Sequence, residues 1–235
     1  MRFLSSVMAV GLVLWGAFVC ADPNDWAERG NGGDVIVCPQ SPLGNLMYDA
    51  YEAEVRYQFK LIFPDLEEPE WPDTGAPNYG DEMSLDFSLK IAKELVQRIE
   101  TQDPVRAQRY FQWLAEFKND TRFLPEVELF DIPDTGIGFI PPQCSLHQLI
   151  IQRTPKFPQD RRYMVALDYW QWMQPEQQAA AILHEIIYRD LAESKAWTGT
   201  SEPARYFNAL ILSDAIGQMS HVEYLNITRR IFNGN

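Results

Sequence analysis

Four side chains with the potential for chemistry lie close together near the carboxyl end of the chain: His184, Glu185, Tyr188 and Arg189. An imidazole can bind a metal ion or carry a proton, and a carboxylate can act as a general base. In a helix, His184 and Tyr188 are one turn apart, and so are Glu185 and Arg189. We therefore expect one polar stripe in which these two pairs are hydrogen-bonded or ion-paired.

The order of these residues is similar to part of the H-E-x-x-H pattern of zinc peptidases (zincins). In that pattern two histidines bind zinc and the glutamate polarises a zinc-bound water. Here Tyr188 stands in place of the second histidine, and the spacing of His147 and His221 does not bring them to His184. A degenerate zincin-like hydrolase, with zinc at His184 and Glu185 as general base, is therefore an alternative to a structural or partner-binding helix.

Two tryptophans, Trp170 and Trp172, come shortly before this segment. Alternate aromatic side chains can stack on a sugar or a peptide, but aromatic residues just before a buried helix more often close the core. A cell-wall glycan-binding or glycan-hydrolysing protein that uses Glu185 as its acid is the second alternative. It lacks an obvious second carboxylate near Glu185.

The segment that carries the motif is expected to be a helix from Pro175 to about Lys195, because Gln174-Pro175 is typical of a helix start. Its apolar side holds Ile182, Leu183, Ile186, Ile187 and Leu191, and its polar side holds Gln177, Gln178, His184, Glu185, Tyr188, Arg189 and Lys195. This pattern fits both a solvent-exposed face and the wall of a cleft. Asp190 projects into the apolar side and needs a partner if it is buried.

The elements that must position this helix mix short strands with long helices. Strands are expected at 35–38, 127–132, 145–153 and 162–168, the last two forming a hairpin with a wide loop. Helices are expected at 43–60, 83–100, 103–118, 175–195 and 201–217. A capping box at Ser220 and Glu223 starts one more helix, the last in the chain. The sequence therefore predicts an α+β fold, in which a small sheet or hairpin packs with about five helices and the C-terminal third is helical.

An acidic segment from Asp65 to Asp86 contains several prolines and no Lys or Arg. It lacks the ordered spacing of a calcium-binding loop. We expect it to be an exposed surface loop whose charges are solvated.

The first 21 residues are typical of a cleavable signal peptide: Arg2 precedes an uncharged apolar run, and Val19 and Ala21 suit a cut before Asp22. The run is short for a bilayer span of about 20 residues, so we expect no membrane anchor after cleavage. Residues 22–235 are then a single secreted or periplasmic globular domain, within the usual size range of one core.

Two features of the mature chain follow from its composition. Cys38 and Cys144 are the cysteines that remain after Cys20 is removed, and in an exported protein we expect them to form a disulfide. Loss of Arg2 leaves 19 Lys and Arg against 33 Asp and Glu, a formal charge of 19 − 33 = −14. Such a charge disfavours nucleic acid and anionic membranes as partners.

Several scattered stretches resemble an uncharacterised family of secreted proteins from predatory Gram-negative bacteria. They are residues 30–38, Cys144 with Gln148, and Gln178 to Ala180 leading into His184-Glu185-Ile186-Ile187-Tyr188-Arg189. The resemblance implies export and a His-Glu-x-x-Tyr-Arg helix, but no reaction. The sequence thus favours an exported soluble protein without catalysis, whose ligand would be a peptide, a protein or cell-wall material.

Overall fold

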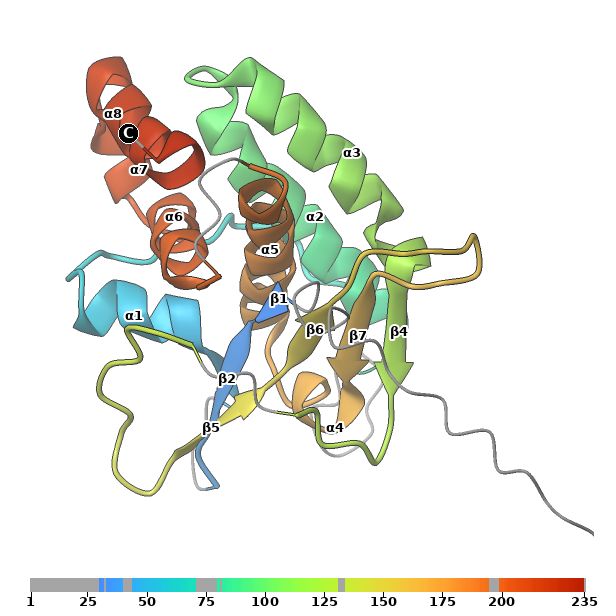
Figure 1. Ribbon diagram of the computed structural model, residues 1–235. Coiled ribbons are helices and arrows are strands. Elements are labelled where there is room, and N and C mark those ends of the chain that lie inside the picture. Colours follow the sequence, from blue (N-terminus) through green and yellow to red (C-terminus); the bar gives the residue numbers. More distant parts are fainter. Residues whose placement is uncertain are drawn as a thin grey trace, which may run out of the picture.

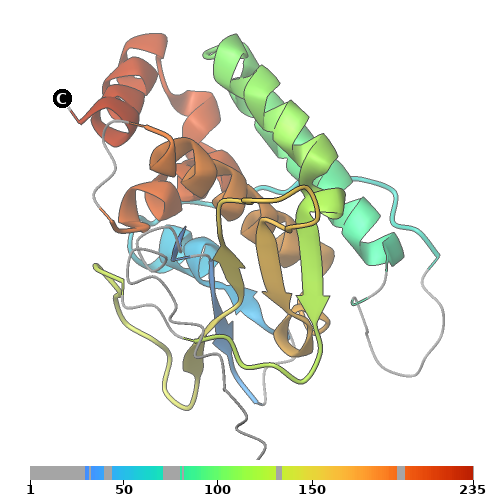
Figure 2. The same ribbon diagram turned by 45° about the vertical axis from the view of Figure 1, so that its right-hand side comes forward.

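The computed structural model describes residues 30–31, 33–39, 44–70, 80, 82–130, 134–194 and 199–234. Within them the chain forms two small sheets and eight helices, which confirms the expected α+β class (Figures 1 and 2). The predicted signal peptide lies outside the described residues. None of the described helices is long and apolar enough to cross a membrane.

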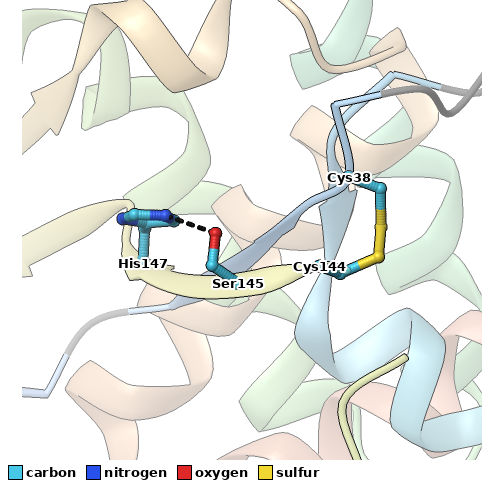
Figure 3. The surroundings of a disulfide bond; sticks show 4 residues. All are labelled: Cys38, Cys144, Ser145 and His147. Carbon is cyan, nitrogen blue, oxygen red and sulfur yellow. Dashed lines mark hydrogen bonds between the residues drawn. A yellow bond between two sulfur atoms is a disulfide. The ribbon is translucent and has the colours of Figure 1, made fainter. Parts of the chain in front are cut away.

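The smaller sheet has three antiparallel strands in the order β3-β2-β5. Their bounds are Asp34–Val37 for β2, Leu46–Met47 for β3 and Ser145–Gln148 for β5. The strand expected at 35–38 is therefore present, one residue earlier. Cys38 follows β2 and Cys144 precedes β5, and the two form the expected disulfide with their Cα atoms 4.4 Å apart (Figure 3).

The larger sheet has four strands in the order β1-β6-β7-β4, with bounds Gly30–Asn31, Ile150–Gln152, Tyr163–Ala166 and Thr121–Leu124. β6 and β7 form the expected hairpin, while β4 joins β7 in parallel. The single strand expected at 145–153 is divided between β5 of the smaller sheet and β6, and the strand expected at 162–168 ends at Ala166, where α4 follows. The strand expected at 127–132 was wrong for its described part, 127–130. The strand forms earlier because Phe123 packs edge-on against Trp170, and Glu126, at φ 55°, ends it.

The part of the chain that the structure describes contains eight helices: α1 Tyr48–Val55, α2 Glu82–Glu100, α3 Pro104–Asp120, α4 Leu167–Trp170, α5 Pro175–Ala192, α6 Glu202–Leu212, α7 Ala215–Gln218 and α8 His221–Asn233. The helices expected at 83–100, 103–118 and 175–195 match α2, α3 and α5 closely. The capping box at Ser220 and Glu223 is formed at the start of α8.

Two expected helices are shorter in the structure. The helix expected at 43–60 extends only over α1, because Leu46–Met47 pairs with β2 and Gln58 adopts φ 56°. The helix expected at 201–217 is interrupted at Ser213, which is extended and bridges Leu61. In both places a contact with a distant segment overrides the local helical pattern.

The acidic segment was predicted to be a loop as far as Asp86. Asp65, Glu67, Glu68 and Glu70 are exposed and lie outside helices and strands, as expected, while 71–79 fall outside the described residues. The prediction was wrong at its end, because α2 begins at Glu82. Asp86 stays exposed on this helix and pairs with Lys118 of α3 at 2.9 Å.

Helix α5 forms the centre of the molecule, with α2 on one side, α6 on the other and strands in front (Figure 1). Much of its polar side is buried like its apolar side: Gln178 and Glu185 have no exposed surface, and neither has Ile186, while Gln177 and Arg189 are partly exposed. A helix that is covered all round belongs to the core. The polar stripe predicted from the sequence is therefore not a solvent-exposed face.

Candidate functional site

His184 lies midway along α5, is 1% exposed, and is held by a carboxylate from another helix. Its Nδ1 is 2.8 Å from Oδ2 of Asp49 in α1. Asn208 of α6 donates from Nδ2 to the same oxygen at 2.7 Å and to the Ala180 carbonyl at 2.9 Å. The Asp49 carboxylate thus ties α1, α5 and α6 together.

The charge of Asp49 decides the protonation of this imidazole. Burial disfavours the charged ring, but the Asp49 carboxylate acts through its charge and its hydrogen bond, and the pKa of His184 rises to about 9. At neutral pH His184 is therefore an imidazolium. Its ring stacks on that of Tyr188 with the centroids 6.1 Å apart. The two residues are thus in contact through their rings, whereas the prediction was a hydrogen bond or ion pair.

Glu185 is also fully buried and is bonded to the strands. Its Oε1 accepts a hydrogen bond from the Gly33 main-chain N–H at 2.8 Å, and its Oε2 accepts one from Nε2 of Gln152 at 3.0 Å. Burial raises the pKa of the Glu185 carboxyl, although the neighbouring His184 charge favours ionisation. Both oxygens of the candidate general base are thus occupied by groups of the chain itself.

Gly33 makes this approach possible. A Cβ atom at this position would lie only 2.4 Å from the Met47 Cε atom and 3.6 Å from the His184 Cδ2 atom. A larger residue would require the end of the buried Met47 side chain to move. The sequence placed Gly33 in a flexible loop before a strand, and its role depends on contacts that the sequence does not display.

The expected pair of Glu185 with Arg189 is not formed. Glu185 is bonded to Gly33 and Gln152, whereas Arg189 pairs with Glu193 at 3.2 Å and lies over the Trp113 ring at 4.2 Å. This part of the prediction was wrong, because the two residues are covered by different elements. The polar stripe is therefore divided between a contact to the strands and a contact to α3.

Asp190 has the partners that its burial requires. Its carboxylate accepts hydrogen bonds from Nε of Arg106 at 2.8 Å and from the Tyr110 hydroxyl at 2.9 Å, and Nη2 of Arg109 lies 2.7 Å away. These groups all come from α3. Asp190 therefore attaches α5 to α3 and takes no part in the surroundings of His184.

A second group of buried charges adjoins Asp49 and was not identified from the sequence. Arg205 of α6 is 1% exposed, and its Nε donates to Oε2 of Glu52 at 3.0 Å. Its Nη1 donates to the Asp134 carboxylate, and its Nη2 donates to the Thr135 carbonyl at 2.9 Å. Arg205 thereby fixes the start of the loop 134–144 against α1 and α6.

Asp34 of β2 lies between these two groups and is 6% exposed. Burial raises the pKa of its carboxyl to about 7, an effect that the charges of Asp134 and Asp49 enhance and those of His184 and Arg205 reduce. A single Asp at the start of a strand is an ordinary surface pattern, so nothing in the sequence distinguishes this residue as a buried one.

A surface groove lies beside the charged group, between α1 and the loop 134–144, with a volume of about 450 Å³. The loop passes next to α1 (Figure 1). The hydroxyl of Tyr48 accepts a hydrogen bond from the Gly138 N–H at 2.7 Å, and Nη1 of Arg56 is 3.3 Å from the Gly136 carbonyl. The groove is lined by residues that include Tyr48, Tyr51, Val55, Arg56, Ile137 and Phe139.

The other histidines lie apart from His184. His147 is hydrogen-bonded to Ser145 at 2.8 Å (Figure 3) and to Tyr169 at 3.0 Å, while His221 is 3.3 Å from Gln102. In the described part of the chain, no three His, Cys, Asp or Glu residues are placed to hold a metal ion. The zinc expected at His184 under the zincin alternative would therefore need ligands from elsewhere.

The two tryptophans do not share a surface. Trp170 is fully buried, whereas Trp172 is 47% exposed. The Trp170 ring packs edge-on against Phe123, with the centroids 5.5 Å apart. Trp170 therefore closes the core, and a stacking platform would have to use Trp172 alone.

Comparison of the chain with family models, with curated proteins and with solved structures found no match. The α+β arrangement and the buried groups around α5 are therefore interpreted from their own geometry. They define a helix that is joined to its surroundings by charged hydrogen bonds, next to an open groove on the surface.

Proposed function

We propose that the chain is an exported binding protein without hydrolase activity. The His184-Glu185 motif joins its helices and strands, and the groove beside α1 binds a partner. This proposal rests on the surroundings of Glu185. Both of its carboxylate oxygens accept hydrogen bonds from other groups of the chain, and the side chain has no exposed surface. A general base must instead reach a water or a substrate proton.

The state of His184 supports the same proposal. Zinc binds the neutral imidazole, and because Nδ1 is bonded to Asp49, zinc would bind at Nε2, where it must compete with the proton that the Asp49 charge favours. With a pKa of about 9, that proton is retained at neutral pH. The ion pair with Asp49 is sufficient to explain why a histidine lies in this core position.

Export is supported by two independent features. Residues 1–21 have the composition of a signal peptide. The disulfide joins positions 106 residues apart, and such bonds persist in oxidising compartments. A secreted or periplasmic location agrees with both.

A degenerate zincin-like hydrolase remains the second candidate, because among the described residues Nε2 of His184 has no hydrogen-bonding partner. This nitrogen is the atom that a metal would occupy. The glycan alternative has less support, since Trp170 is buried in the core.

The test is the zinc content and the stability of mature wild-type protein, Glu185→Ala and His184→Ala. We expect no stoichiometric zinc in any of them. We expect Glu185→Ala to lower the free energy of unfolding by about 1–3 kcal/mol, because it leaves the buried Gly33 N–H without its acceptor. Elemental analysis and urea unfolding measure the two quantities.

The opposite result is equally specific. Stoichiometric zinc in the wild type, kept in Glu185→Ala but lost in His184→Ala, would establish the zinc site. Peptide hydrolysis that Glu185→Ala abolishes while the protein stays folded would then establish the hydrolase.

A further inference from the structure

We infer that the groove between α1 and the loop 134–144 binds a basic peptide segment that carries aromatic or aliphatic side chains. This inference rests on the proposed function and specifies its ligand. The groove combines an exposed apolar wall, a firmly held loop and an excess of carboxylates at one end.

The wall of the groove gathers exposed apolar side chains from two separate segments. Val55 of α1 is 53% exposed, and Phe139 of the loop is 65% exposed. Ile137 is 36% exposed and lines the same groove together with the Tyr51 ring. Single exposed apolar residues are common, but a contiguous group of them around a groove marks a binding surface.

The loop that carries Ile137 and Phe139 is anchored at both ends. At one end Arg205 bonds Asp134 and Thr135, and at the other end Cys144 is covalently joined to Cys38. Between these points the Gly138 N–H donates to Tyr48 at 2.7 Å. An apolar surface that is held in place before binding loses less conformational entropy when a ligand arrives.

Gly136 is part of this anchoring. Its φ of +72° is a left-handed conformation that glycine adopts without strain. A Cβ atom there would lie 2.8 Å from the carboxyl group of Glu202. Gly136, which lines the groove, therefore allows the loop to turn directly beside the Glu202 carboxylate. This carboxylate thus lies next to one end of the groove.

The charges at this end favour a cation. Arg56 is paired with Glu52 at 2.6 Å and with Glu202 at 2.8 Å, so its guanidinium is already shared between two carboxylates. The Glu202 side chain is 37% exposed and is paired with Arg56, whose side chain is 42% exposed. With Arg205 included, three carboxylates (Glu52, Glu202 and Asp134) face two guanidinium groups (Arg56 and Arg205), which leaves an excess of one negative charge. The full chain carries a formal charge of −13. A net negative charge attracts cationic partners and repels anionic ones.

The probe is a set of three hexapeptides with fluorescein on the N-terminal amine and the same Phe and Leu residues: fluorescein-Lys-Phe-Lys-Leu-Lys-Phe-amide and its counterparts with Gln or Glu in place of Lys. Fluorescence anisotropy is measured with the mature, disulfide-bonded protein at 50 and 300 mM salt. We expect saturable binding of the Lys peptide, at least tenfold weaker binding of the Glu peptide, and weaker binding of the Lys peptide at the higher salt.

Two variants with matched controls assign the binding to the groove. Phe139→Ser should weaken binding of the Lys peptide at least fivefold. Phe157→Ser should leave it unchanged, because Phe157 is similarly exposed (61%) but lies in the loop between β6 and β7. Glu202→Gln should weaken binding severalfold, whereas Asp86→Asn, which alters a distant exposed ion pair, should not.

The possible outcomes distinguish an error in the proposed ligand from an error in the proposed binding function. If the Gln or Glu peptide binds at least as tightly as the Lys peptide, and Phe139→Ser abolishes that binding, the groove is a binding site but the basic ligand is wrong. Binding of the Lys peptide that Phe139→Ser leaves intact overturns the proposed site. If none of the three peptides binds, both the ligand and the binding function are wrong, while the structural role of Glu185 is tested independently by urea unfolding of Glu185→Ala.

Discussion

Asp49 is the residue at which three helices meet, because its Oδ2 accepts hydrogen bonds from both His184 and Asn208. All three side chains are buried. In such surroundings a charge without its partner is costly, whereas the intact pair is close to neutral in energy. The group therefore specifies how α1, α5 and α6 fit together more than it adds to stability.

We predict that Asp49→Asn lowers the free energy of unfolding at pH 7 by about 3–5 kcal/mol, because it leaves the His184 imidazolium without its counter-charge. Urea unfolding measures the change. The control is Asp86→Asn, which removes an exposed ion pair with Lys118 and should cost less than about 1 kcal/mol.

The double variant Asp49→Asn with His184→Gln extends this test. It should be more stable than the sum of the two single changes implies, since neither charge is then left alone. Additive effects of the two substitutions would contradict the ion pair as the source of the loss.

Sequence reasoning identified His184 and Glu185 but not their partners. Asp49 lies 135 positions from His184, and Gly33 lies 152 positions from Glu185. Asp49 had the pattern of an ordinary helical acid, and Gly33 had that of a loop glycine. Only the packing of the strands and of α1 against α5 brings these groups together, and one sequence carries no local sign of it.

At the scale of the elements, α8 shows what local signals can specify. The Ser220 hydroxyl accepts a hydrogen bond from the Glu223 N–H, and the Glu223 carboxylate accepts one from the Ser220 N–H at 2.8 Å. These bonds satisfy main-chain donors that the first turn leaves unpaired. The pattern involves four consecutive residues, so the sequence alone was enough to predict it.

We predict that Ser220→Ala lowers the free energy of unfolding by about 1 kcal/mol, because the Glu223 N–H loses its acceptor. Denaturant unfolding monitored by circular dichroism measures the loss. Val222→Ala is the matched control: Val222 is 66% exposed in the same turn, and its change should stay within about 0.5 kcal/mol. Equal losses for both variants would contradict a specific role for the cap.

The elements that were misplaced are those that depend on distant partners. Leu46–Met47 continues the helical pattern of α1 but pairs with β2, and Ser213 leaves the helical pattern of α6 to bridge Leu61. β4 was expected several residues later, but it forms where it can pair with β7. Long amphipathic helices such as α2 and α3 were predicted closely, because their pattern and caps are contained within the segment itself.

At the scale of the whole molecule, the buried titratable groups make stability depend on pH. Folding raises the pKa of His184 from its ordinary value of 6.5 to about 9 and that of Asp34 from 3.8 to about 7. In each case the folded chain holds a proton more tightly than the unfolded chain does. Raising the pH therefore favours unfolding, within the interval between the two pKa values of each group.

We predict that the free energy of unfolding falls between pH 5 and pH 9. The stabilisation that comes from protonated His184 is fully present below pH 6.5 and is lost by about pH 9. Its size is on the order of 3 kcal/mol, because the pKa rises from 6.5 to about 9 and each pKa unit corresponds to about 1.4 kcal/mol. The contribution of Asp34 declines over the lower interval and ends near pH 7. The neighbours that set these values are Asp49, Asp134, Glu185 and Arg205, which come from α1, the loop 134–144, α5 and α6.

Urea unfolding at a series of pH values checks the prediction, and two variants assign its parts. Asp34→Asn should flatten the decline below pH 7 and leave the upper part in place, since His184 still titrates. His184→Gln should remove the part between pH 6.5 and pH 9. A wild-type stability that rises over this range would contradict the raised pKa values of both His184 and Asp34, and with them the effect of the Asp49 charge on His184.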